Sequence, residues 1–205
     1  MKRIFFALSL MASPVAAQNV AETLMQPGLL VEMPKENLPC YAHDRQAPPP
    51  DEATTAPENL QDEKVCLVRS ADQGREHLAL SLTDAGQVRI VAQFPMETSN
   101  PILLFFLENV VRNVATHTGG SPYYVRNRIR EALIAGQQTQ EAGVAQVVMR
   151  PFDSDPNRDR LGEFADIAVT LRYDTTDPVR LLQLSADTGD GDSRYTETMT
   201  LLSEE

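Results

Sequence analysis

The sequence is poor in basic residues. Its 18 lysines and arginines stand against 29 aspartates and glutamates, which gives a formal net charge of −11. Such a surface would repel phosphates, so we expect no nucleic-acid partner. The same charge disfavours adsorption to an anionic membrane surface. An acidic excess of this size is typical of a soluble protein.

Long hydrophobic runs are also missing. The N-terminal apolar run, residues 4–12, is far shorter than the roughly 20 residues that a membrane-spanning helix needs. It follows Lys2 and Arg3 and leads to small residues at 15–17, which together form the layout of a secretory signal peptide. We therefore expect residues 1–17 to be removed before Gln18, leaving a soluble mature chain without a transmembrane segment. Its expected location is the periplasm or the extracellular space.

Cysteine is scarce as well, since only Cys40 and Cys66 occur. They form no C-x-x-C motif and have no histidine at zinc-finger spacing, so redox and zinc chemistry are poorly supported. In an exported chain, one even pair predicts a structural disulfide. No cysteine closely follows the expected cleavage site, so lipid attachment is not expected.

Residues 18–63 have the composition of an N-terminal extension with little apolar surface to bury. One turn of helix is expected at residues 21–25 and a short edge strand at 29–31. Three consecutive prolines at 48–50 are incompatible with a helix interior or a central strand. Acidic residues dominate the stretch that follows. We expect a solvated, proline- and acid-rich loop over residues 41–63, which the disulfide would tie at its base.

Residues 64–205 are expected to form a single α+β domain without internal repeats. Residues 65–69 are expected to form a strand that precedes two further strands, residues 78–83 and 87–94. In these last two segments the side chains alternate with period two, which is typical of half-buried strands. A short turn at 84–86, which contains a glycine, joins the last two. The pattern predicts a three-stranded antiparallel meander.

The pattern then changes to that of two helices. Asn100-Pro101 and Ser121-Pro122 are pairs in which a capping residue precedes a proline of the first turn. Glycines at 119–120 and 136 are expected to end the two helices. The sequence therefore predicts a helical hairpin. Its first turns, residues 102–107, are apolar on every side, as in a centrally buried helix.

Further strands are expected in the last third of the chain, joined by tight turns rich in Gly and Asp. They are residues 144–149, 165–173, 179–185 and 195–202. Strands, then two helices, then strands predict an α+β fold with a mainly antiparallel sheet. We expect both helices to pack on one face of that sheet.

One loop has oxygen-bearing side chains at alternate positions, as at the start of a calcium-binding loop. They are Asp153, Asp155, Asn157 and Asp159. However, Arg158 stands where such a loop needs glycine, and Pro156 interrupts it. The other interpretation is a plain turn between strands. We expect neither a metal nor a cofactor, and calcium remains an alternative at this loop.

A local excess of arginine stands out in this acidic chain. The helical hairpin carries four arginines and two neighbouring tyrosines suited to an anion or a partner surface. These residues are Arg112, Arg126, Arg128, Arg130, Tyr123 and Tyr124. The alternative is that the arginines pair with acids of the same chain, such as Glu108 and Glu131.

Three functions follow from these patterns. The first is non-enzymatic binding of another macromolecule, such as an envelope protein, through the arginines and the acidic loop. The second is a carrier for an apolar or anionic small ligand, with residues 102–107 lining a pocket and Arg126 or Arg130 holding the head group. The third is a hydrolase-type enzyme that would use His117 and Ser121 with Asp153 and Asp155. The sequence favours a protein that is not an enzyme, because Ser121 lies in no G-x-S-x-G motif.

Overall fold

The computed structural model describes residues 20–49, 59–190 and 194–203. The expected signal peptide and its cleavage site lie outside the described residues, as do residues 50–58 of the expected loop. Among the described residues, no helix combines the length and the apolar character that crossing a membrane would need.

The strands of the described residues form one nine-stranded antiparallel sheet, in the order β4-β3-β2-β1-β9-β8-β7-β6-β5. The strands are β1 (Cys40–Gln46), β2 (Leu60–Asp72), β3 (Arg75–Asp84), β4 (Gln87–Pro95), β5 (Gln138–Glu141), β6 (Val144–Met149), β7 (Ala168–Asp174), β8 (Leu181–Asp187) and β9 (Thr196–Leu201). The helices are α1 (Val20–Leu24), α2 (Pro101–Thr118) and α3 (Pro122–Ala135), with short 3-10 helices at Lys35–Asn37, Arg158–Arg160 and Gly162–Asp166.

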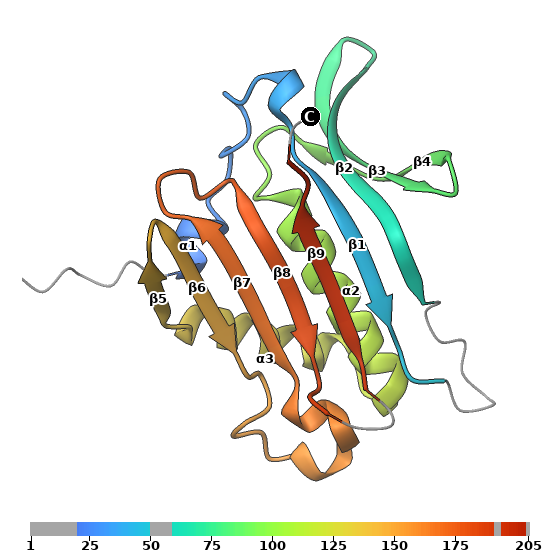
Figure 1. Cartoon of the computed structure of the whole chain (residues 1–205), viewed down its shortest axis with the longest axis vertical. Coiled ribbons are helices and arrows are strands. Elements are labelled where there is room, and N and C mark those ends of the chain that lie inside the picture. Colours follow the sequence, from blue (N-terminus) through green and yellow to red (C-terminus); the bar gives the residue numbers. More distant parts are fainter. Residues whose placement is uncertain (1–19, 50–58, 191–193, 204–205) are drawn as a thin grey trace, which may run out of the picture.

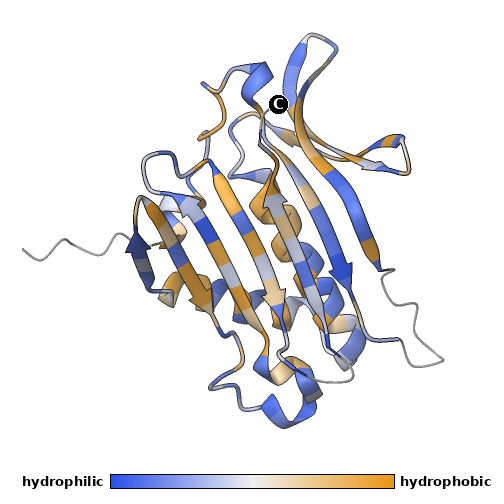
Figure 2. Ribbon diagram, viewed as in Figure 1, coloured by the Kyte–Doolittle hydropathy of each residue, from blue (hydrophilic) through white to orange (hydrophobic). Residues whose placement is uncertain are grey.

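The helices lie on one face of the sheet, behind it in the view of Figure 1. Side chains alternate along the strands, so that β7 buries Val169, Leu171 and Tyr173 on the helix side. This alternation appears as changing hydropathy along β7 and β8 in Figure 2. The expected α+β fold, with an antiparallel sheet and two longer helices, is confirmed.

Local signals explain where the helical hairpin begins and ends. The Asn100 side chain accepts hydrogen bonds from the backbone N–H groups of Ile102 (3.0 Å) and Leu103 (3.4 Å), and Pro101 occupies the first turn. Gly119 ends α2 with a φ of 64°, a left-handed conformation that a side chain would disfavour. The two predicted helices are thus present close to their expected limits.

The predicted meander is β2, β3 and β4, paired in antiparallel register. Ala85 and Gly86 both have positive φ (44° and 79°), which matches the two-residue turn that joins strands with the normal twist. In the last third, β6, β8 and β9 lie near their predicted positions. The strand expected from residue 165 starts only at Ala168, because Gly162–Asp166 forms a 3-10 helix. The short strand β5 was not predicted.

The expected loop over residues 41–63 is wrong at both ends. Residues 41–46 belong to β1, which lies inside the sheet between β2 and β9, and β2 already begins at Leu60. The helix-facing side chains of β1 include His43 and Arg45, so the strand lacks the apolar alternation by which strands are recognised. At these two positions β1 turns polar side chains toward the helices, where most strands carry apolar ones.

The N-terminal segment packs into the same core as the sheet. The predicted turn of helix at 21–25 is present as α1, and Val20, Leu24 and Leu30 are buried. The edge strand expected at 29–31 is wrong, because these residues lie in a turn. Arg69 of β2 fixes that turn by donating hydrogen bonds to the carbonyl groups of Leu30 (3.0 Å), Val31 (2.6 Å) and Met33 (2.6 Å).

The predicted disulfide is confirmed. Cys40 of β1 and Cys66 of β2 are directly paired across the two strands, with Cα atoms 4.1 Å apart and an S–S bond of 2.04 Å. Their neighbours Tyr41 and Val65 are buried on the helix side. Since side chains alternate along a strand, the bond lies on the opposite face of the sheet.

Candidate functional site

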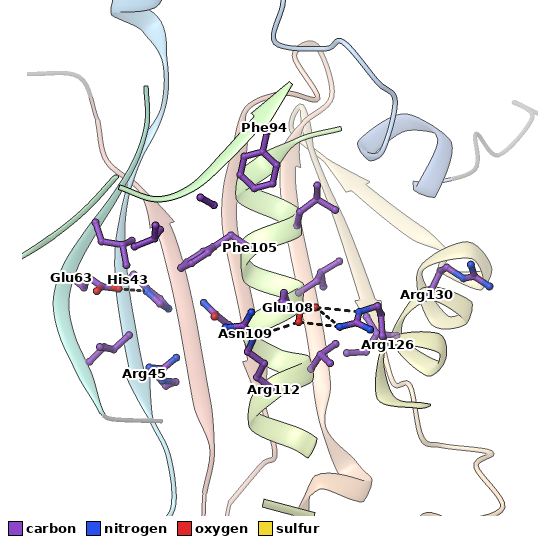
Figure 3. Close-up of a pocket in the computed structure, with 18 of the residues that line it drawn as sticks. His43, Arg45, Glu63, Phe94, Phe105, Glu108, Asn109, Arg112, Arg126 and Arg130 are labelled. Atoms are coloured by element: carbon purple, nitrogen blue, oxygen red, sulfur yellow. Dashed lines mark hydrogen bonds and ion pairs between the residues drawn. The ribbon is translucent and has the colours of Figure 1, made fainter. Parts of the chain in front are cut away.

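A cleft of about 700 Å³ lies beside α2, between α3 and the strands β1 to β4 (Figure 3). We call it the α2 cleft. Most of its wall is apolar, and the large apolar side chains of its lining include Leu82, Phe94, Leu104, Phe105, Leu107 and Leu133. Ligand sites in proteins are typically concave and mainly apolar, with volumes of about 300–1,000 Å³.

Residues of α2 contribute both to the hydrophobic core and to the wall of the α2 cleft. Ile102, Leu103 and Phe106 are fully buried in the hydrophobic core. On the neighbouring face of the same turns, Leu104 and Phe105 are only half-buried and line the α2 cleft. This division explains why residues 102–107 are apolar on every side.

Arginine accumulates around this apolar wall. The lining contains five arginines but only two acids, Glu63 and Glu108. The arginines are Arg45, Arg89, Arg112, Arg126 and Arg130. Such an excess of positive charge in a protein with a net charge of −11 gives the cleft a local preference for anions.

Polar and apolar groups are separated along the α2 cleft. Figure 3 places Phe94 and Phe105 toward one end, and Arg45 and Arg112 toward the other. Arg126 approaches from α3 on the remaining side. The cleft therefore has an apolar region and a cationic region.

A buried polar network lies at the strand side of the cleft. His43 is 1% exposed, and its Nδ1 lies 2.9 Å from Glu63 Oε2 while its Nε2 lies 2.8 Å from Glu197 Oε1. Glu197 also accepts hydrogen bonds from the Tyr195 hydroxyl and from Asn113 Nδ2 (3.5 Å). Ionised carboxylates only accept hydrogen bonds, so His43 satisfies both by carrying a proton on each ring nitrogen.

Electrostatics favour that doubly protonated ring. Burial opposes the charge on His43, but the hydrogen bonds and charges of Glu197 and Glu63 outweigh it, so the pKa of His43 is raised. Arg45 lies 3.9 Å from Glu197, and Arg89 lies 3.7 Å from Glu63. The two buried carboxylates thus face three cationic groups.

The predicted arginine cluster is not one continuous surface. Arg112 and Arg126 both bind Glu108, at shortest distances of 3.4 and 2.9 Å. Arg128 instead contacts Glu131 (2.7 Å) and turns away from the α2 cleft. Pairing within the chain therefore accounts for three of the four arginines, whereas exposed Arg130 forms no ion pair with any described residue.

The two tyrosines of the cluster differ in their surroundings. Tyr123 is 75% exposed and its ring lies 5.5 Å from the guanidinium carbon of Arg126. Tyr124 donates its hydroxyl to both carboxylate oxygens of Asp155, at 2.5 and 2.6 Å. Tyr123 is therefore the more exposed of the two, and the hydroxyl of Tyr124 is already engaged.

The candidate calcium loop is held to α3 by its own side chains. Besides Tyr124, Asp155 contacts Arg128 Nε (2.7 Å) and the backbone N–H of Asn157 (2.7 Å). Burial disfavours the Asp155 carboxylate, but these partners outweigh it and lower its pKa. Among the described residues, no group of three or more His, Cys, Asp or Glu side chains is arranged to hold a metal ion. Asp153 and Asp159 do not join Asp155 in such a group.

Two of the residues considered for catalysis, His117 and Asp155, are bound to other groups of the chain. Both ring nitrogens of His117 lie near backbone carbonyl oxygens, those of Asn113 (2.8 Å) and Pro48 (3.2 Å), and the ring stacks on Phe164. Ser121 stands at the start of α3, where it makes no side-chain cap hydrogen bond. Asp155 is bound to Tyr124, so the geometry gives the enzymatic hypothesis no support.

Sequence reasoning identified part of the α2 cleft and missed the rest. It named residues 102–107 with Arg126 and Arg130, but not the strand residues His43 and Glu63, whose pairing is visible only once β1 and β2 are aligned. No protein-family model matches the chain, and no curated protein shows significant similarity to it.

Proposed function

We propose that this protein binds a small amphiphile in the α2 cleft, without catalysing its conversion. The proposed ligand has an apolar body and an anionic head group. The observation that carries this proposal is the combination of an apolar wall with five arginines in a protein of net charge −11. Apolar surface supplies binding free energy, whereas arginine selects an anionic group by its paired donors.

The proposal includes export of the mature protein after removal of residues 1–17. The Cys40–Cys66 disulfide supports it, because such bonds persist mainly in oxidising compartments. A carrier outside the cytosol would shield the apolar body of its ligand from water while leaving the protein itself soluble. The fit between compartment and cleft favours a carrier role over a signalling role inside the cell.

Two substitutions on β4 test the ligand site. Val91 lines the α2 cleft and is 40% exposed, whereas Val88 on the same strand does not line it and is 69% exposed. We expect Val91→Asp to weaken binding of dodecanoate at least tenfold, because it puts a carboxylate against the apolar body and near the head group. Val88→Asp should change the affinity less than twofold. Isothermal titration calorimetry measures both.

The matched pair controls for folding and for net charge, since both variants carry the same substitution at exposed positions of one strand. Equal effects of Val91→Asp and Val88→Asp would contradict a ligand site in the α2 cleft. Absence of dodecanoate and dodecanol binding by the wild-type protein would contradict the function itself.

A second candidate function is binding of another protein at the edge strand β4. Val88 and Ile90 are 69% and 52% exposed there, and no strand in the described part of the chain pairs with the outer side of β4. The opposite edge, β5, is a short polar strand of four residues. Long apolar edges readily accept an added strand, so the occupant would be an extended segment of another exported protein. This edge would replace the paired arginines as the contact surface.

Photo-crosslinking tests this second candidate. A photoreactive residue at Ile90 should capture one defined protein in the native exported fraction, through a segment that mass spectrometry maps to a single stretch. The same residue at Val148, which is 45% exposed on β6, serves as the control. Equal capture from Ile90 and Val148 would contradict a specific edge interaction.

A further inference from the structure

The pair of arginines that binds Glu108 has the geometry of a carboxylate site. Arg126 Nε lies 3.2 Å from Glu108 Oε2, and its Nη2 lies 3.0 and 2.9 Å from the two carboxylate oxygens. Arg112 adds a contact of 3.4 Å from its Nε to Glu108 Oε1. Arg126 thus binds Glu108 in the bidentate arrangement in which arginine recognises carboxylates strongly, and Arg112 adds a second guanidinium to the same carboxylate.

This site lies on the wall of the α2 cleft, and Glu108 is a replaceable occupant of it. All three residues line the cleft. The Glu108 side chain is 35% exposed and that of Arg126 is 45% exposed, so water can solvate both when they separate. Two arginines also leave one positive charge uncompensated after Glu108 is bound, and Arg130 adds another nearby. The site therefore attracts a further anion.

The position of Glu108 on α2 connects the anion site with the apolar wall. Leu104 and Phe105 lie four and three residues before Glu108, on neighbouring turns of one helix face. A carboxylate bound between Arg112 and Arg126 would place an attached alkyl chain along Leu104 and Phe105. In Figure 3 this direction leads from Glu108 toward Phe94.

We propose that Glu108 is an internal competitor of the ligand, and that the carboxylate head group of an alkyl carboxylic acid displaces it from Arg112 and Arg126. This inference rests on the proposed function of the α2 cleft. It assigns the ligand class, a long-chain carboxylate, and a residue that sets the affinity. No bond is made or broken in the exchange, since one carboxylate replaces another on the same donors.

Glu108→Gln tests the displacement. The substitution keeps the size of the side chain but removes the charge that competes for the arginines. We expect the affinity for dodecanoate to rise about tenfold, which corresponds to roughly 1.4 kcal/mol, and the affinity for dodecanol to change less than twofold. Both are measured by isothermal titration calorimetry at pH 7.5, with circular dichroism to verify folding.

Glu131→Gln is the matched control, because it removes the same charge from the neighbouring helix while Glu131 does not line the cleft. It should raise the dodecanoate affinity less than twofold. Equal effects of the two variants, or an equal gain for dodecanoate and dodecanol, would overturn the displacement while leaving the binding function standing. If neither ligand binds the wild type or Glu108→Gln, the proposed function fails and this inference fails with it.

Free carboxylic acids and larger lipids can present the same acyl chemistry. Titration with lysophosphatidic acid below its critical micelle concentration separates the two sources, since a phosphate head group is larger and carries more charge. The carboxylate site predicts that Glu108→Gln increases binding of free dodecanoate more than that of the phosphate lipid. A larger gain for the phosphate lipid would overturn the assignment of the ligand class.

Discussion

Replacing His43 by leucine is expected to remove about 3–5 kcal/mol from the free energy of unfolding, the cost of breaking a buried ion pair by deleting one partner. The substitution leaves Glu63 and Glu197, which are 3% and 0% exposed, without the cation that lies between them. For a domain of this size the melting temperature should fall by roughly 6–20 °C. Urea and thermal unfolding followed by circular dichroism measure both changes.

His117→Leu is the matched control. His117 is a half-buried histidine of α2 whose ring nitrogens lie near backbone carbonyl groups rather than carboxylates. Its loss should cost about 1 kcal/mol, the net value of an ordinary hydrogen bond. If His43→Leu lowers the free energy of unfolding no more than His117→Leu does, the ion pairs of the network beneath the α2 cleft stabilise the fold no more than ordinary hydrogen bonds.

The contribution of His43 should also depend on pH. Its pKa is raised in the folded protein above the ordinary value of 6.5. The protonated ring therefore stabilises the fold fully below pH 6.5, and this stabilisation is lost as the pH rises through the folded pKa. The difference in unfolding free energy between wild type and His43→Leu should shrink over that range. The charged groups that face His43 are Glu63 and Glu197, with Arg45 and Arg89 behind them.

Removal of the disulfide should produce the second large effect. The bond joins residues 26 apart, and the double variant Cys40→Ala/Cys66→Ala should lose about 3–4 kcal/mol, because its unfolded chain is no longer constrained by that loop. The midpoint of urea unfolding should fall accordingly.

A reductant provides the control for this second effect. It should lower the midpoint of the wild-type protein to near that of the double variant, and it should leave the double variant unchanged. A wild-type midpoint that is insensitive to reductant under unfolding conditions would contradict the expected stabilisation. Free thiols in the protein isolated from its native compartment would contradict the proposal of export.

The strands and helices that sequence patterns predicted are those whose own residues carry a clear local signal, such as strand periodicity or a helix cap. β3 alternates apolar and polar residues, and α2 begins at a capping asparagine followed by proline. In β1 the helix-facing positions after Tyr41 are His43 and Arg45, so no apolar alternation marks it as a strand. The charges of His43 and Arg45 are paired with Glu63 and Glu197. These acids are distant in sequence, so a local pattern does not reveal the pairing.

The candidate site was predictable to the same extent. The apolar first turns of α2 and the arginines of α3 indicated a ligand with an apolar body and an anionic group. Arg126 of α3 pairs with Glu108 of α2, and because these residues are 18 positions apart in sequence, no local pattern located the proposed anion site. Arg128, although it belongs to the same run of arginines, contacts Asp155 because a helix turns successive side chains to different directions.

The pairing of β1 with β9 has a consequence for the order of folding. β1 to β4 form one run of sequence-adjacent hairpins and β5 to β9 another, and within the sheet of the described residues these two runs are hydrogen-bonded to each other only where β1 pairs with β9. The contact between His43 and Glu197 crosses this seam and joins residues 154 positions apart. Closing so large a loop is slow, and it cannot occur until the last strand is available. A nascent chain would therefore stay open along this seam until β9 has been made, which is compatible with the proposed export, because a chain that is threaded through a translocation channel must not fold beforehand.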